Sequence, residues 1–208
     1  MISKEAFDVI EKKHGKYASW AVWMDEREGH NSPSDNIDNL SIFSLDKNPH
    51  LLEILKPNIV MVGIGFGGNR GHIDPELLKD WPSFWNFHYK GQGKKDHKLR
   101  YVFRNTDFYG AYMTDLIKYY SAVNPDMDYL NDPIVKEKSK EIFDTELKDL
   151  GAKPELIIAF GDYVYNTLVE FYSNDYNIKK VLHYSHSKAN NKDEYKKIVI
   201  GTLKNWKK

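Results

Sequence analysis

The feature that most constrains this chain is a continuous apolar run that ends in a glycine-rich segment. Ile59 to Val62 reads Ile-Val-Met-Val without a polar interruption, and Gly63 to Gly71 contains five glycines. A short apolar run bounded by turn residues is typical of a strand that is buried on both faces of a sheet. We therefore predict that Ile59 to Asn69 forms a buried strand running into a glycine-rich turn, and that this turn binds the ligand.

Apolar runs of the same kind recur downstream and alternate with helical patterns. The further predicted strands each meet a polar or glycine residue at the carboxyl end: Ala111 to Thr114, Leu156 to Phe160, and Val181 to Leu182, with Tyr17 to Met24 as an additional candidate. Apolar residues at helical spacing predict helices at Lys4 to His14, His50 to Leu55, Ile134 to Leu150, Asp162 to Tyr172, and Asp193 to Trp206. This alternation predicts an α/β fold with a parallel sheet flanked by helices, in which ligands bind beyond the carboxyl ends of the strands.

Composition limits the function classes. The 208-residue chain fits a single domain, residues 1–208, that can bury a core without disulfides. It has no cysteine, which excludes thiolate nucleophiles and zinc–thiolate sites. No apolar run approaches the roughly 18 residues that a membrane helix needs, and the N-terminus lacks the apolar centre of a signal peptide. We therefore expect a cytoplasmic protein without a membrane partner.

Charge is balanced overall but unevenly distributed. The segment from His88 to Arg104 carries six Lys or Arg against Asp96 alone, and Lys188 to Lys208 carries seven lysines against two acids. These segments are either solvated helix faces or surfaces that bind a polyanion. The segment from Asp25 to Asp38 is rich in Gly, Asn, Ser and Pro and is predicted to be a loop that is mobile or faces a ligand.

The glycine-rich segment after Val62 contains the pattern G-x-G-x-x-G, which also occurs in dinucleotide-binding folds. That motif should open directly into a helix and be followed about 20 residues later by an acidic residue at the end of a second strand. Here Asn69 to Pro75 continues as loop, and Asp80 precedes Trp81-Pro82. A Rossmann-type dinucleotide enzyme therefore stays a secondary alternative, and a tight turn without a ligand is another.

Three further loops carry groups suited to binding or chemistry. Trp81 to Tyr89 packs five aromatics and a histidine into nine residues, which either stack on bases or anchor a short helix to the core. Asp115 is predicted where a strand leaves the sheet, so its carboxylate either binds a ligand or caps the next turn. His183 and His186 are three residues apart without a third ligand, so no metal is expected. An imidazole at His183 would instead stabilise negative charge on a ligand oxygen.

Together these segments resemble the uracil-DNA glycosylase superfamily. Its members have a glycine-rich turn after the first core strand, a Tyr-x-Thr-Asn-like strand, a Pro-x-x-Ile-x-Ala-x-Gly strand and a His-Pro-Ser loop. The match covers about Pro57 to Ser187, and the counterparts are Gly63-Ile64-Gly65-Phe66-Gly67, Tyr112-Met113-Thr114-Asp115, Pro154 to Gly161, and His183-Tyr184-Ser185. Phe84-Trp85 resembles the Phe-Trp pair of the mismatch-specific branch. The resemblance implies a three-layer α/β/α sandwich around a central, mainly parallel four-stranded sheet, with a flipped base held between the glycine-rich and histidine loops and no cofactor.

The chain departs from the family pattern at its functional positions. Active branches carry a carboxylate or amide at the second or third position of the first motif, where this chain has Ile64 and Gly65. The family's base-recognising Asn is here Asp115, which has no amide donor for a uracil carbonyl. The histidine motif keeps His183 and Ser185 but lacks both prolines. The resemblance thus implies a divergent member that recognises a different base or none.

The predicted function is a uracil-DNA glycosylase-like protein that binds a nucleobase or nucleic acid and either excises a base or acts as a non-catalytic nucleic-acid or nucleotide binder. The expected partner is DNA or a small molecule that contains a nucleobase. As catalytic residues we predict Asp74 or Asp115 to position water and His183 to stabilise the departing base. The predicted ligand-binding residues are Gly63, Ile64, Gly65, Phe66, Gly67, Asn69, Phe84, Trp85, Ser185 and His186.

Overall fold

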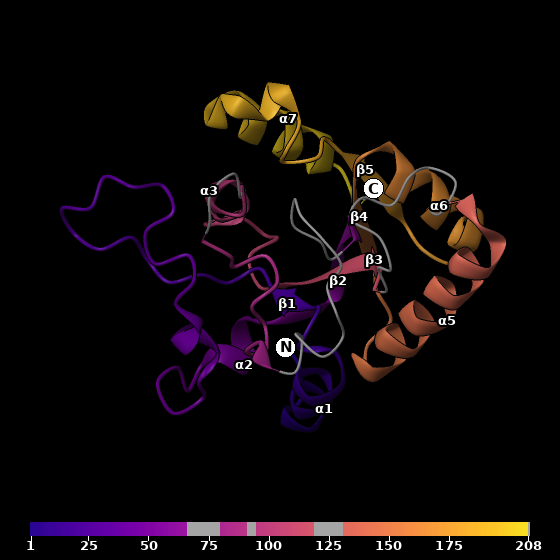
Figure 1. Cartoon of the computed structure of the whole chain (residues 1–208), viewed down its shortest axis with the longest axis horizontal. Coiled ribbons are helices and arrows are strands. Elements are labelled where there is room, and N and C mark those ends of the chain that lie inside the picture. Colours follow the sequence, from indigo (N-terminus) through magenta and orange to yellow (C-terminus); the bar gives the residue numbers. More distant parts are fainter. Residues whose placement is uncertain (66–79, 91–94, 119–130, 208) are drawn as a thin grey trace.

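The structure of the chain is a computed structural model that describes residues 1–65, 80–90, 95–118 and 131–207. A sheet of five strands in the order β1-β3-β2-β4-β5 forms its centre (Figure 1). The strands are β1 (Ser19–Trp20), β2 (Lys56–Gly65), β3 (Ala111–Ile117), β4 (Leu156–Phe160) and β5 (Ile178–Val181). β3, β2, β4 and β5 are parallel, and β1 pairs antiparallel with β3. The fold is therefore α/β with a mostly parallel sheet, as predicted.

The prediction of four strands was wrong, because β1 adds a fifth strand at the free edge of β3. Ser19 and Trp20 pair there with Met113 and Tyr112. β1 comprises only these two residues of the predicted strand. The next residue, Ala21, still donates its N–H to the Ala111 carbonyl at 2.8 Å, whereas the N–H of Val22 donates back to the Trp20 carbonyl at 2.7 Å.

Helices cover both faces of the sheet (Figure 1). They are α1 (Lys4–His14), α2 (Leu51–Ile54), α3 (His97–Phe103), α5 (Pro133–Asp149), α6 (Asp162–Tyr172) and α7 (Lys192–Leu203), with 3₁₀ turns η1 (Leu40–Phe43) and η3 (Ser187–Asn190). Helices α1, α5 and α6 lie with one apolar cluster, and α3 and α7 lie with the other. The predicted helices are confirmed, with shifts of a few residues at the ends of most of them.

The strands supply side chains to both clusters in alternation. In β2, Val60 and Val62 face α5 and α6, whereas Ile59 and Met61 face α3 and α7. Successive side chains of a strand point to opposite faces, so a strand covered on both sides must be apolar at every position. This is why the run from Ile59 to Val62 has no polar residue.

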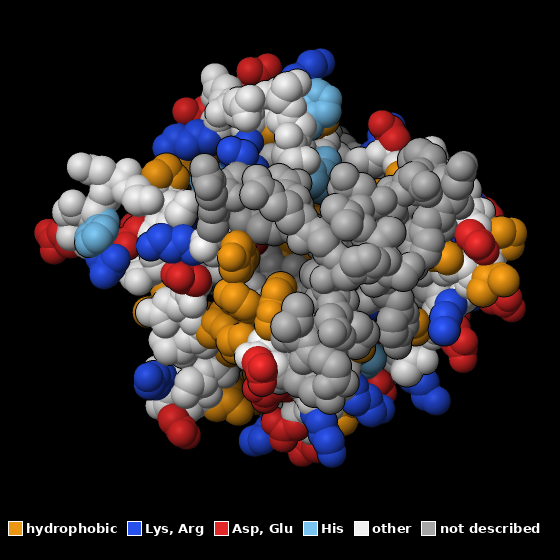
Figure 2. Space-filling view, viewed as in Figure 1, with side chains coloured by type: hydrophobic (Ala, Val, Ile, Leu, Met, Phe, Trp, Pro, Cys, Tyr) orange, Lys and Arg blue, Asp and Glu red, His pale blue; other side chains and the backbone are white. Residues whose placement is uncertain are grey.

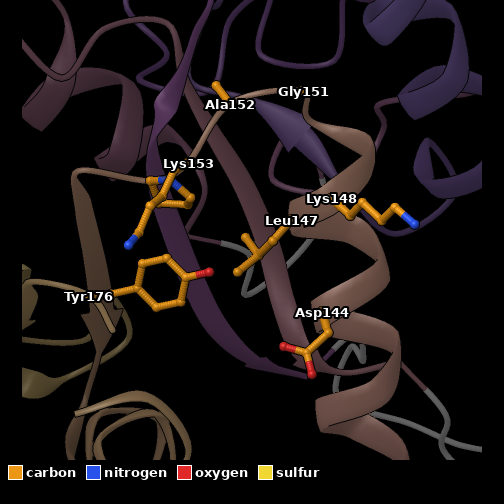
Figure 3. Close-up of a pocket in the computed structure, with 8 residues that line it drawn as sticks. Asp144, Leu147, Lys148, Gly151, Ala152, Lys153 and Tyr176 are labelled. Carbon is orange, nitrogen blue, oxygen red and sulfur yellow. The ribbon is translucent and has the colours of Figure 1, made fainter. Parts of the chain in front are cut away.

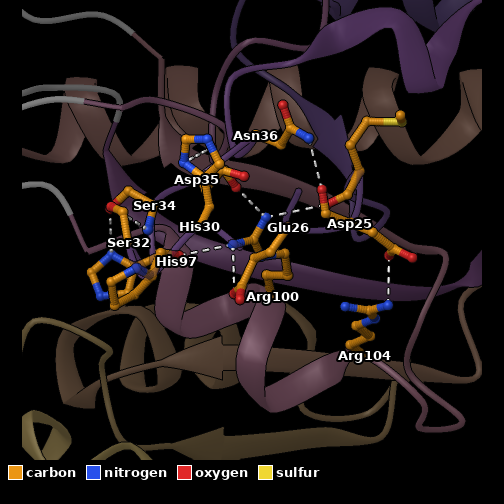
Figure 4. A network of polar contacts seen from close by, with 12 residues as sticks. Asp25, Glu26, His30, Ser32, Ser34, Asp35, Asn36, His97, Arg100 and Arg104 are labelled. Atoms are coloured by element: carbon orange, nitrogen blue, oxygen red, sulfur yellow. Dashed lines mark hydrogen bonds and ion pairs between the residues drawn. The ribbon is translucent and has the colours of Figure 1, made fainter. Parts of the chain in front are cut away.

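The segment between β1 and η1, which was expected to be mobile or to face a ligand, is tied to α3 by a polar network (Figure 4). The buried Arg100 guanidinium donates to the carbonyls of Met24 at 3.1 Å, Pro33 at 2.8 Å and Asp35 at 2.6 Å, and to the Glu26 carboxylate at 2.9 Å. Hydrogen bonds from Arg27 hold the pKa of the Asp35 carboxyl well below its usual range. Arg100 is therefore a structural residue of this loop.

The surface of the described residues mixes charge with some apolar groups. Figure 2 shows Lys, Arg, Asp and Glu side chains spread around the rim of one face, while hydrophobic side chains reach the surface near its centre. Within the described ranges, no helix has both the length and the apolar character that crossing a membrane requires.

Candidate functional site

Asp115 lies inside β3 rather than at the point where the strand leaves the sheet, because β3 continues to Ile117. Asp115 is only 4% exposed. Met113, two positions earlier, packs in the cluster of α3 and α7, so alternation along the strand directs Asp115 to the same face. A carboxyl group is thus buried on this face near the carboxyl end of the sheet.

Gly63 is the residue of β2 that makes room for this carboxyl group. The two residues are partners in the parallel register, and a Cβ built on Gly63 would lie 2.2 Å from Oδ1 of Asp115. The sequence predicted a glycine-rich turn from Gly63 onward, but Gly63, Ile64 and Gly65 are the last residues of β2. The glycine at position 63 is therefore explained by the neighbouring side chain.

Several predicted site residues cannot be placed. Phe66, Gly67, Asn69 and Asp74 lie outside the described residues. Ile64 is placed, and its half-buried side chain packs against the cluster of α5 and α6, on the opposite face from Asp115. Of the predicted glycine-rich segment, the structure thus brings only Gly63 into contact with Asp115 among the residues that it describes.

Asn86 is the hydrogen-bond partner of Asp115, and sequence reasoning missed it. Its side-chain amide donates to Oδ2 of Asp115 at 2.9 Å and to the carbonyl of Tyr17 at 2.6 Å. Burial raises the pKa of the Asp115 carboxyl to about 7, although the hydrogen bond from Asn86 and the charge of Lys118 act in the opposite direction. Asp115 therefore exchanges a proton near neutral pH. The only sequence signal for Asn86 is an amide within an otherwise aromatic run.

Tyr184 lies in the histidine loop, and the charge of Asp115 acts on its phenol. Burial raises the pKa of the Tyr184 phenol well above its usual value, and the negative charges of Asp96 and Asp115 raise it further. Its ring stacks on the His183 ring with centroids 4.4 Å apart and an interplanar angle of 20°. Asp96 is itself buried and accepts the backbone N–H of Tyr89 at 3.0 Å. Neither Tyr184 nor Asp96 was among the predicted site residues.

His183 carries a neutral imidazole whose proton can be assigned. Burial, with a smaller contribution from the charge of His186, lowers the pKa of His183 to about 4. The backbone N–H of Ser185 donates to Nδ1 at 3.1 Å, and the Ser185 hydroxyl lies 2.7 Å from the same nitrogen. Because Nδ1 accepts, the ring proton is on Nε2. Ser185, which was predicted to bind the ligand, thus leaves Nε2–H of His183 as a hydrogen-bond donor.

The histidine loop is held from two helices. Lys98 of α3 donates to the carbonyl of Tyr184 at 3.1 Å and to the Asn190 side chain at 3.4 Å. The Tyr195 hydroxyl of α7 donates to the carbonyl of Leu182 at 2.9 Å. His186 is used locally, since its Nδ1 accepts the N–H of Lys188 at 3.1 Å and caps η3. The loop is therefore positioned by buried polar groups.

The basic segment expected to bind a polyanion is only partly available for that role. Lys98 and Arg100 are 6% and 3% exposed and hold loops in place. Arg104 forms an ion pair with Asp25 at 2.6 Å. Lys90 is exposed and Lys95 is half-buried, whereas Lys94 lies outside the described residues. A phosphate surface on this segment would therefore depend on Lys90 and Lys95.

The aromatic segment from Trp81 to Tyr89 divides into inward and outward residues. Phe84 and Phe87 are 1% and 2% exposed, so of the two alternatives core anchoring holds for these two rings. They are anchored without the helix expected for this spacing, since both have a positive φ, 63° and 64°. Trp85 is half-buried. The structure thus places Phe84 in the core and Trp85 at the surface.

Behind β3, on the face of α5, lies a second buried polar cluster. The Lys118 ammonium is 2.6 Å from Oε2 of Glu146, and their side chains are 1% and 0% exposed. Thr114 donates to the same carboxylate at 2.7 Å, and the Tyr112 hydroxyl also donates to it. All four groups are engaged with one another, so this cluster fixes β3 against α5.

A surface pocket of about 310 Å³ lies away from Asp115, beside the amino end of β4 (Figure 3). Its lining residues are Asp144, Leu147, Lys148, Gly151, Ala152, Lys153, Pro154 and Tyr176. Figure 3 shows Leu147 and Tyr176 pointing toward each other and Lys148 pointing away. Asp144 already accepts the Tyr172 hydroxyl at 2.7 Å and pairs with Lys140 at 2.7 Å. The predicted residues do not contribute to this pocket.

The described residues thus offer a carboxyl group at Asp115 that titrates near neutral pH and a neutral imidazole at His183 whose Nε2–H is a hydrogen-bond donor. Across the described parts of the chain, no group of three or more His, Asp or Glu side chains is placed to bind a metal ion. A search of protein-family models, curated proteins and solved structures finds no match for this chain.

Proposed function

We propose that this chain is a uracil-DNA glycosylase-like protein that binds a nucleobase, free or within nucleic acid, at the carboxyl ends of β2, β3 and β5. The observation that carries the proposal is the meeting of separate segments around Asp115. Gly63 of β2 and Asn86 of the aromatic segment contact its carboxyl group. The negative charge of Asp115 also acts on Tyr184, whose ring stacks on that of His183. Helices on both sides of the sheet support the three-layer α/β/α arrangement that the resemblance implies.

The two titratable groups, Asp115 and His183, suit different roles toward a bound base. A carboxyl with a pKa of about 7 both donates and accepts protons near neutral pH, so Asp115 is suited to hydrogen-bond the polar edge of a base or to activate water. A neutral His183 that donates from Nε2 is suited to stabilise negative charge on an oxygen of a departing base. Burial of both groups strengthens such interactions.

Base binding is the first property to measure. The probes are the free bases uracil, cytosine, adenine and guanine, and short single- and double-stranded DNA. Binding of each probe is measured by thermal shift and by titration. We expect binding to at least one probe that is weakened in Asp115→Ala and His183→Ala. Arg104→Ala is the control, because Arg104 follows α3 and forms an exposed ion pair with Asp25. Binding of none of these probes by the wild-type chain contradicts the proposal.

Base excision is the second property, and the two forms of the function separate here. Ile64 and Gly65 bring no carboxylate or amide to the first motif, so excision of uracil is not expected. Labelled strands that contain uracil, hypoxanthine or a mismatch are incubated with the protein and cleaved with alkali. Strand breaks at uracil would overturn this expectation. Breaks at another base, lost in Asp115→Ala and His183→Ala but kept in Arg104→Ala, would assign the chemistry to the proposed site.

The non-catalytic form of the proposal is favoured by the same first motif. The Asp115 side chain occupies the space that a Cβ at position 63 would need, and Ile64 packs into the core on the other face. A binding site that keeps Asp115 and His183 without a polar side chain at Ile64 and Gly65 retains hydrogen-bonding groups for a base. Binding without strand breaks at any base in the excision assay is the result expected for this form.

A further inference from the structure

Three half-buried aromatic residues follow one another along the segment 80–90. The ring centroids of Trp81 and Trp85 are 4.7 Å apart, and those of Trp85 and Tyr89 are 5.0 Å apart, with both pairs in edge-to-face contact. We call Trp81, Trp85 and Tyr89 the aromatic ladder. Each of these residues keeps part of its surface open, whereas Phe84, Phe87 and His88 between them are buried. Half-buried rings therefore alternate with fully buried ones along this segment.

The backbone that carries the ladder is strained and firmly held. Phe84 and Phe87 have φ values of 63° and 64°, which bulky residues rarely adopt and which persist only where the surroundings enforce them. The Phe84 N–H donates to the Gly15 carbonyl at 2.6 Å, and its carbonyl accepts the Ser19 hydroxyl at 2.9 Å. The indole N–H of Trp23 donates to the Phe87 carbonyl at 3.3 Å. The ladder is thus fixed before any ligand binds.

Lysines stand at both ends of the ladder. The Lys16 ammonium donates to the carbonyl of Trp81. At the other end, exposed Lys90 follows Tyr89, and Lys95 precedes Asp96, whose carboxylate accepts the Tyr89 N–H. Asp80 is the acidic residue at the start of the segment. Aromatic rings with cations beside them match a ligand that alternates planar bases with phosphates.

From this geometry we propose that the aromatic ladder is a stacking platform for single-stranded nucleic acid that leads to the site at Asp115. The inference rests on the proposed function and adds the form of the substrate. The link between the two is Asn86, which belongs to the same segment as the ladder and contacts Asp115 directly. A strand whose base reaches Asp115 passes over this segment, so its neighbouring bases meet Trp85 and the rings beside it.

The test compares fluorescein-labelled dT12 with dTMP and with a duplex of the same length, using anisotropy and quenching of tryptophan fluorescence. We expect dT12 to bind more tightly than the duplex. Trp85→Ala and Trp81→Ala should weaken dT12 by about 5- to 100-fold each, which is the range for loss of one stacked base. Binding of dTMP, which does not span the ladder, should change less than about threefold. Lys90→Ala should reduce the salt dependence of dT12 binding, because a lost phosphate contact releases fewer counterions.

Two controls keep the result interpretable. Trp85→Phe keeps an aromatic ring and should retain most of the affinity, which separates stacking from a folding defect. Tyr101→Ala removes another tyrosine flanked by lysines, since Lys192 and Lys196 lie 4.7 and 5.2 Å from its ring, and it should leave dT12 binding unchanged. Equal losses in Tyr101→Ala and Trp85→Ala would indicate general attraction to basic aromatic surfaces and overturn the proposal.

The remaining outcomes separate this inference from the proposed function. Unchanged dT12 affinity in Trp81→Ala and Trp85→Ala, with loss in Asp115→Ala, overturns the ladder and leaves the base site standing. A change in self-association of the ladder variants by sedimentation velocity, with dT12 binding intact, assigns the rings to an interface between copies and also overturns it. A wild-type chain that binds neither dT12 nor any base overturns both.

Discussion

The side-chain amide of Asn86 donates to Oδ2 of Asp115 at 2.9 Å, and this bond joins the aromatic segment to the centre of the sheet. An amide donor serves the carboxyl oxygen whether Asp115 is neutral or charged. Burial favours the neutral form, whereas the bond from Asn86 favours the charged one. The balance places the titration of Asp115 in the range where a small change in its surroundings changes its charge.

Replacing Asp115 by Asn should change how stability depends on pH. The pKa of Asp115 is about 7 in the fold, against 3.8 for the ordinary carboxyl. The folded state therefore binds more protons between these pH values, and wild-type stability contains a contribution that falls as pH rises from about 4 to about 7. Asp115→Asn lacks this contribution. Its free energy of unfolding relative to that of wild type should therefore rise by roughly 2–4 kcal/mol between pH 4 and pH 8. Urea unfolding of both proteins at several pH values measures the difference, and a difference that is constant with pH contradicts the raised pKa.

Gly63→Ala should destabilise the fold because the added methyl group collides with the Asp115 side chain. The new Cβ would lie 2.2 Å from Oδ1 of Asp115, so the carboxyl group must move. We expect a loss of about 1–3 kcal/mol in the free energy of unfolding, as for other overpacked core positions. In an Asp115→Ala background the obstacle is gone and the loss should largely disappear.

Gly201→Ala is the matched control for this change. Gly201 lies within α7, and a Cβ there meets nothing within 4 Å. Because alanine is a better helix former, this substitution should stabilise the fold by about 0.5–1 kcal/mol. Similar losses from Gly63→Ala in the wild-type and Asp115→Ala backgrounds would show that the carboxyl group is not the obstacle.

The imidazole of His183 should stay neutral and carry its proton on Nε2 through the physiological pH range. Burial lowers its pKa to about 4, and the Ser185 N–H occupies Nδ1. Nitrogen-detected NMR of labelled histidine reports which ring nitrogen is protonated. Ser185→Ala removes the hydroxyl but keeps the backbone donor, so the tautomer should persist. A proton on Nδ1, or a midpoint near 6.5, would contradict the assignment.

Much of the fold could be predicted from the sequence, and the residues show why. The bounds of α6 and β4 follow from the apolar run Leu156 to Phe160, the turn at Gly161 with a φ of 92°, and the helical spacing after it. The start of α1 is likewise a local feature, since the Ser3 hydroxyl accepts the Ala6 N–H at 3.2 Å. These signals are local, since each residue is read against its near neighbours in the chain.

The candidate site was harder to predict because its contacts join distant parts of the chain. Nothing next to Asp115 indicates that it faces Gly63, since this follows from the register of β2 and β3. The spacing of Phe84 and Phe87 suggests a helix, but their positive φ values exclude it. That backbone is enforced by bonds from Gly15, Ser19 and Trp23, which no pattern within the segment reveals.

Removing one partner of the Lys118–Glu146 ion pair should destabilise the fold more than removing both. Both side chains are almost fully buried, 1% and 0% exposed, with ammonium and carboxylate 2.6 Å apart. Removing one partner leaves the other charge buried alone, so Lys118→Met or Glu146→Leu should each lose about 3–5 kcal/mol. The double variant should recover much of that loss. Urea unfolding of the four proteins measures the coupling, and additive losses would show that the two groups act independently.

Arg100→Met should release the segment between β1 and η1 while the sheet stays folded. The guanidinium is bonded to three backbone carbonyls and to Glu26, and methionine retains only the apolar part of the side chain. Buried carbonyls without a partner destabilise the fold, so we expect a loss of at least about 2 kcal/mol. Hydrogen exchange should accelerate in residues 24–38 and much less in β2 and β4.

Arg104→Ala is the control for this last change, since it removes an arginine from the end of the same helix. Arg104 and Asp25 form an ion pair at 2.6 Å, but their side chains are 41% and 72% exposed. Exposed pairs contribute less than about 1 kcal/mol because water screens them. Exchange in residues 24–38 should therefore stay close to that of wild type. If Arg104→Ala accelerates exchange there as much as Arg100→Met does, the segment is held by the net positive charge of α3 and not by the directed bonds of Arg100.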